Sequence, residues 1–243
     1  MSVRRRAGAP FLAVAALVGA ALVGAQEHTV TPGSVEGRPA RGAESPVQAL
    51  IDRAAPGATV ATWSVAASGS VLVYMAEDAG SVVKQRLAGI CSHRGLDLVA
   101  LPIGVITAPS LRLDLPRDQA RLHETVRRHA PRLLVLDPFV RLHRVNENQA
   151  QDVSAILGYL RELQRAHDLA LVVVHHARKN GGHSGGQSLR GSSDFFAWVD
   201  TALSLRRQRQ QLWLSAEHRA AQAGEPIALA LLGTERDMHM AAV

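Results

Sequence analysis

The stretch RLLVLD, from Arg132 to Asp137, decides the fold class of this chain. Its apolar run, which ends in an acid, is typical of a strand that is buried on both faces and stops at the edge of a sheet. Such continuous runs belong to parallel sheets, because helices cover both faces of those sheets. The stretch therefore predicts a central strand of an α/β domain.

Similar apolar runs lie on either side of this stretch, and segments with helical periodicity separate them. The further strands are expected at Ser70–Ala76, Gly104–Ala108 and Leu169–His176, and helices near residues 79–94, from Pro116 onward and over 149–167. Regular alternation of strand and helix predicts a mostly parallel sheet with helices on both faces. After the fourth strand, the segments TALSLRR, QLWLSAEHR and IALALLG predict shorter strands in C-terminal β-hairpins.

Composition limits the classes of function that remain. Hydrophobic residues make up 47% of the 243 residues, which is enough for one large core. The formal charge of +6 permits binding to nucleotides or nucleic acid without demonstrating it. Cys91 is the only cysteine, which excludes an intrachain disulfide and a four-thiolate zinc site. A chain of this kind fits a reducing cytoplasm.

The first 69 residues have a different character. A basic start precedes Phe11–Ala25, an apolar run of 15 residues that ends in small residues, as in a secretory signal. The run is too short and too rich in Ala and Gly for a stable membrane span. The segment that follows it is rich in Gly, Pro and Arg. We therefore expect residues 1–69 to be poorly ordered, and residues 70–235 to form the α/β domain.

Acids and histidines follow three of the predicted strands. Glu77 and Asp78 follow the first, Asp137 ends the third, and His175 and His176 end the fourth. Ligands of parallel α/β sheets bind at the carboxyl ends of the strands. The sequence therefore predicts that these side chains converge at one edge of the sheet and form a functional site.

Each of these groups has a catalytic interpretation and a structural one. Asp137 suits a Mg²⁺ ligand, although many buried strands end in an Asp that serves as a turn residue. Glu77 suits a general base for an attacking water, or Glu77 and Asp78 cap the next helix. His175 and His176 suit contact with a terminal phosphate, a metal site with His183, or a plain polar strand end.

Basic residues near the end of the domain suggest two further contacts. Arg178, Lys179 and Arg190 lie in a Gly-rich loop, which suits contact with a nucleic-acid backbone but equally suits a solvated loop. Arg206, next to Arg207, follows a predicted strand and suits an arginine finger that reaches a neighbouring subunit's nucleotide.

The chain from Ser70 to Leu232 resembles a known family. The segments VLVYMAEDAGSVVKQRLAGI, RLLVLDPFVRLHRVNENQAQDVSAILGYLRELQRAHDLALVVVHHARK and SLRGSSDFFAWVDTALSLRR are similar to the RecA-like, AAA-type ATPases of the RepA class, which include hexameric plasmid replicative helicases. The resemblance implies a RecA-like P-loop NTPase core, ATP and Mg²⁺ as cofactors, DNA as a partner and a hexamer. It also implies that Glu77 is the catalytic acid, Asp137 the Walker B aspartate, and His175–His176 the phosphate sensor.

One part of the family pattern is missing from the sequence. The family places GxxxxGK[ST] between a strand and a helix ahead of the Glu77 strand, and this loop's amides and lysine hold the phosphates. The only lysines are Lys84 and Lys179, and no Gly-Lys-Ser or Gly-Lys-Thr occurs. We therefore expect the chain as written to bind ATP weakly or not at all.

Three functional hypotheses follow from these observations: an oligomeric ATPase acting on DNA, a non-catalytic binding or assembly module derived from one, and a secreted α/β protein. The last hypothesis depends on residues 1–25 alone. The resemblance starts abruptly near Val65, as a shifted reading frame would produce. Under that interpretation the signal-like segment is an accident of the frame, and the protein is cytoplasmic.

Overall fold

The computed structural model describes residues 69–93, 95–146, 150–176, 193–209, 211–220, 223–232 and 239–242. Its elements are, in chain order, β1 (Val71–Met75), α3 (Gly80–His93), η1 (Leu98–Ala100), β2 (Ile103–Ile106), α4 (Pro116–His129), β3 (Leu133–Asp137), η2 (Phe139–Arg141), α5 (Ala150–His167), β4 (Ala170–Val173), α6 (Ser193–Trp198), β5 (Thr201–Gln208), β6 (Gln211–His218), β7 (Ile227–Leu232) and β8 (His239–Ala242).

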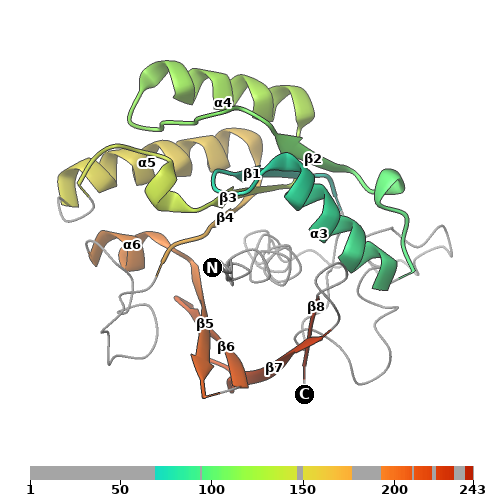
Figure 1. Cartoon of the computed structure of the whole chain (residues 1–243). Coiled ribbons are helices and arrows are strands. Elements are labelled where there is room, and N and C mark those ends of the chain that lie inside the picture. Colours follow the sequence, from blue (N-terminus) through green and yellow to red (C-terminus); the bar gives the residue numbers. More distant parts are fainter. Residues whose placement is uncertain are drawn as a thin grey trace, which may run out of the picture.

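The first four strands form a parallel sheet in the order β2-β1-β3-β4 (Figure 1). In the register between β1 and β3, Met75 lies opposite Asp137. The stretch that ends in Asp137 is thus an interior strand, and every residue of β3 is buried. The predicted parallel α/β core is therefore confirmed.

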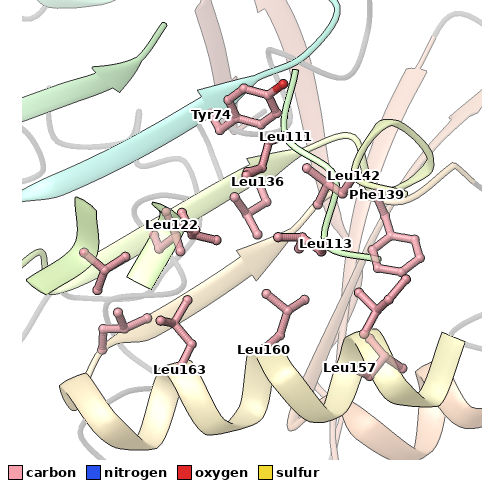
Figure 2. Close-up of a cluster of buried hydrophobic side chains, with 14 of the residues drawn as sticks. Tyr74, Leu111, Leu113, Leu122, Leu136, Phe139, Leu142, Leu157, Leu160 and Leu163 are labelled. Carbon is pink, nitrogen blue, oxygen red and sulfur yellow. The ribbon is translucent and has the colours of Figure 1, made fainter. Parts of the chain in front are cut away.

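Alternate residues of the strands face opposite sides of the sheet, as the period of two requires. Leu72, Tyr74, Leu134 and Leu136 pack with α4 and α5. Figure 2 shows the same cluster, in which Leu157, Leu160 and Leu163 of α5 point toward the strands. On the other face, Val71, Val73, Met75, Leu133 and Val135 pack with residues of α3. Helices therefore cover both faces of the sheet, as expected.

The C-terminal strands form a second, antiparallel sheet in the order β5-β6-β7-β8. Successive strands pair with one another, so the predicted hairpins are confirmed. Leu212, Leu214 and Leu229 form the small buried core of this sheet. In Figure 1 it lies beyond α6, on the opposite side of the first sheet from α4.

Several sequence-based expectations fall outside the described residues. These are the disorder of residues 1–69, apart from Gly69, the apolar run 11–25, and the basic loop that contains Arg178, Lys179, His183 and Arg190. Within the ranges given above, no helix is both long enough and apolar enough to cross a membrane.

Candidate functional site

Backbone hydrogen bonds bring the carboxyl ends of three strands together. The amide of Ala76, just after β1, donates to the carbonyl of Asp137 at 2.8 Å. The amide of Val174, just after β4, donates to Leu136 at 2.9 Å, and the amide of Phe139 donates to Val174 at 2.8 Å. The segments that carry Glu77, Asp137 and His175 therefore lie at the same edge of the sheet.

Asp137 is a buried carboxylate among other acids. Its side chain belongs to a residue that is only 4% exposed. Burial raises its pKa to about 7, the charges of Asp78 and Glu77 raise it further, and Arg86 opposes them. The edge thus concentrates negative charge, and a hard cation would relieve that repulsion.

The donor set fits Mg²⁺. This ion prefers carboxylate oxygens and usually takes only one or two of them, with water and substrate phosphates completing its octahedron. Across the described ranges, no group of three or more His, Cys, Asp or Glu side chains has the arrangement of a metal cage. A single buried carboxylate at a strand end, with two acids nearby, is consistent with a partly open Mg²⁺ site.

Two arginines neutralise the acids that follow β1. Arg86 of α3 donates to the Asp78 carboxylate at 2.7 Å. Arg141 of η2 donates to Glu77 at 2.7 Å, with side chains that are 58% and 41% exposed. The interpretation of Asp78 as a helix cap therefore gives way to an ion pair with a residue on the second turn of α3.

Arg141 is anchored by its own backbone. The side chain of Arg112 donates to the Arg141 carbonyl. Phe139, at the start of η2, is fully buried among the sheet and helix residues. The guanidinium that holds Glu77 therefore projects from a fixed support beside Asp137.

The two histidines after β4 lie in different environments. His175 stacks on Phe195 of α6, with ring centroids 4.6 Å apart and an interplanar angle of 21°, and it meets the edge of Phe139. His176 is exposed. His175 thus connects the sheet edge to the helix that follows the Gly-rich loop, whereas His176 is open to solvent.

The remaining predicted site residues do not join this edge within one chain. Arg206 lies in β5 opposite Trp213, in the antiparallel sheet. Arg178, Lys179 and Arg190 lie outside the described residues. Sequence reasoning missed Arg86, Arg141 and Phe195. For Arg141 the available signal was its place four residues after Asp137 within the family-like segment.

Comparison with protein families gives one match. The family model described as "AAA domain" matches residues 48–182, a range that includes β1 to β4 and the carboxylates at their ends. The matched range starts well before Ser70. No curated protein matches the sequence.

Solved structures with similar folds include ATPase domains of RecA type. One is a separately solved ATPase domain, with a TM-score of 0.54 at 13% identity, over 70% of this chain and 74% of its own. A DnaB-like replicative helicase has a TM-score of 0.54 at 14% identity over 70% of this chain, and the match covers 50% of the helicase chain. The RadB recombinase has a TM-score of 0.50 at 18% identity, over 70% of this chain and 78% of its own. These likenesses establish the RecA-like fold.

Proposed function

The chain belongs to the AAA domain family, and we propose that it is a RecA-like ATPase of the helicase type, descended from the RepA class, that couples ATP hydrolysis to work on DNA. The observation that carries this proposal is the convergence of Asp137, Glu77 and His175 at the carboxyl edge of β1, β3 and β4. A buried acid, a more exposed acid and an imidazole at one edge match the parts of a phosphoryl-transfer site.

Each residue has a distinct role in the proposed site. Asp137 would hold Mg²⁺, which, when bound, offsets the charge of the phosphates. Glu77 is the general base, since its carboxylate is exposed enough to accept a proton from water. His175 contacts the terminal phosphate, and its stacking on Phe195 offers a route by which α6 senses that contact.

The residues that would hold the phosphates themselves do not fit ATP. No Gly-Lys-Ser or Gly-Lys-Thr occurs in the chain. The arginines beside the acids are already engaged, Arg86 with Asp78 and Arg141 with Glu77. We therefore propose that the chain as written binds ATP weakly and is catalytically inactive.

The proposed partners follow from the family and from the solved relatives. One of these relatives is, by its title, a DnaB-like replicative helicase that interacts with primase. For this chain we propose a cytoplasmic homo-oligomer, hexameric when active, that contacts DNA through Arg178, Lys179 and Arg190 and supplies Arg206 to a neighbouring nucleotide site. The bond pattern within one chain leaves Arg206 remote from Asp137, as an in-trans role requires.

A second candidate function is a non-catalytic binding or assembly module. The missing phosphate loop favours it for the chain as written. The secreted α/β protein has support only from residues 1–25.

Titration of the purified chain with fluorescent ATP in Mg²⁺ tests the proposal. We expect no saturation below about 1 mM ATP, because neither loop amides nor a lysine neutralise the phosphates. Micromolar affinity that Asp137→Ala abolishes would instead indicate a complete nucleotide site, with another cation in the role of the lysine. Glu162→Gln, which changes an exposed carboxylate on α5, is the matched control.

A further inference from the structure

Two histidines meet on the outer side of the helical layer. His123 belongs to α4, and His167 is the last residue of α5. Their Nε2 atoms are 3.3 Å apart, and their rings meet edge to face with centroids 4.6 Å apart. His167 precedes the amino end of β4, so the pair lies at the opposite edge of the sheet from Asp137.

The distance between the two nitrogens suits a shared metal ion. Zinc binds imidazole nitrogen at about 2.0–2.1 Å in tetrahedral geometry, which places two such nitrogens about 3.3–3.4 Å apart. The observed 3.3 Å falls at that separation. It is longer than the usual N–H···N or N–H···O hydrogen bond of about 2.9–3.0 Å.

The helices that carry the pair are fixed to one another. The hydroxyl of Tyr159 in α5 donates to the carbonyl of Gln119 in α4 at 2.8 Å, one turn before His123. Leu122, Val126 and Leu163, close to the pair in sequence, are buried in the common core. An ion bound between the histidines would therefore need little ordering of the chain.

The local charges also permit a cation there. His167 lies at the carboxyl end of α5, where the helix dipole favours positive charge. The nearby Arg127 is held by Glu124 through two hydrogen bonds of 2.8 and 2.9 Å, which offset its charge. Burial lowers the pKa of His167, and His123 and Arg127 lower it further, so the neutral imidazole that a metal requires is favoured.

We propose that His123 and His167 bind one divalent transition-metal ion of the Zn²⁺ and Ni²⁺ class through their Nε2 atoms. Water completes its coordination, because in the described ranges no third His, Cys, Asp or Glu joins the pair. The ion links α4 to α5 and leaves open positions, so the site exchanges its metal readily. The proposal stands independently of the nucleotide site.

Calorimetric titration of the full chain with Zn²⁺ and with Ni²⁺ tests this site. We expect His123→Ala and His167→Ala each to weaken the metal affinity by about tenfold or more, because each removes one of two ligands. His129→Ala is the matched control, since His129 is an exposed histidine at the end of α4 outside the pair. Its affinity should equal that of the wild type.

A second measurement keeps the test independent of folding defects. The melting temperature in EDTA shows whether each variant is folded, and His123→Gln replaces His123→Ala if the alanine variant is not. Zn²⁺ should raise the melting temperature of the wild type and of His129→Ala, but not that of either pair variant. Wild-type affinity in a pair variant, or an equal loss in His129→Ala, would overturn the proposal.

Discussion

The carboxylate of Asp137 combines burial with the nearby charges of Asp78 and Glu77, and its pKa is about 7 as a result. An acid whose folded pKa is above its unfolded value of about 3.8 stabilises the fold most below that unfolded value. This contribution is lost as the pH rises through 7, because the folded state must then hold an unfavourable charge. The residue proposed to bind Mg²⁺ is thus a site of stored repulsion in the free protein.

Asp137→Asn should therefore raise the free energy of unfolding more at pH 8 than at pH 5. The two pH values span about two pKa units below 7, and each unit corresponds to about 1.4 kcal/mol, so the difference is on the order of 2–3 kcal/mol. Urea denaturation in EDTA measures it, with Glu162→Gln as the control. Equal effects at both pH values would contradict the raised pKa, and Mg²⁺ should stabilise the wild type alone.

The ion pair between Arg141 and Glu77 makes a different kind of prediction. Because both side chains are more than one-third exposed, its loss in Arg141→Ala should cost less than about 1 kcal/mol of stability. The same change removes a positive charge beside the acids, so affinity for Mn²⁺, used as a probe of the Mg²⁺ site, should rise several-fold. Calorimetry measures that affinity.

Arg128→Ala is the matched control for that experiment, because it breaks an exposed pair with Glu124 on α4. It should leave the Mn²⁺ affinity unchanged. A weaker affinity in Arg141→Ala would show that Arg141 supports the acids in their binding positions instead of competing with the ion.

At the scale of elements, the order of strands and helices followed from the sequence because burial imposes strong periodicity. The apolar runs of β1 and β3 and the stripe of α5 from Val153 to Leu163 are buried as expected. The partners of the acids did not follow from the sequence. Arg86 and Arg141 resemble the many surface arginines, and only the packing of α3 and η2 beside the strand ends selects them.

Two positions of α5 test how its faces divide the work. Gly158 is exposed, and a Cβ added to it meets no atom within 4 Å, so Gly158→Ala should raise stability by about 0.5–1 kcal/mol through helix propensity. Leu160 is 0% exposed, and Leu160→Ala should cost about 2–5 kcal/mol by leaving a cavity. Thermal and urea denaturation measure both changes. Destabilisation by Gly158→Ala would show that this face contacts another part of the chain.

At the scale of the whole molecule, the acids, the arginine partners and the RecA-like sheet are present together, whereas the phosphate loop is missing. The family model matches from residue 48, yet the segments that resemble the RepA class begin at Ser70. Gradual divergence would weaken a loop and its flanking strand and helix together, since they share core constraints. An abrupt change of character before a well-preserved site is typical of a shifted reading frame.

We therefore predict that another frame of the DNA encoding residues 30–65 specifies a strand, a Gly-rich loop with Gly-Lys-Ser or Gly-Lys-Thr, and a helix. A protein expressed from the restored frame should hydrolyse ATP in a Mg²⁺-dependent manner, because the loop amides and the lysine would then position the phosphates against Asp137 and Glu77. A steady-state phosphate-release assay measures the rate. Asp137→Ala should abolish it and Glu77→Gln should reduce it strongly, whereas Glu162→Gln should leave it unchanged. If no frame encodes such a loop, the loss of the loop is genuine, and a binding or assembly role explains the preserved fold better than catalysis does.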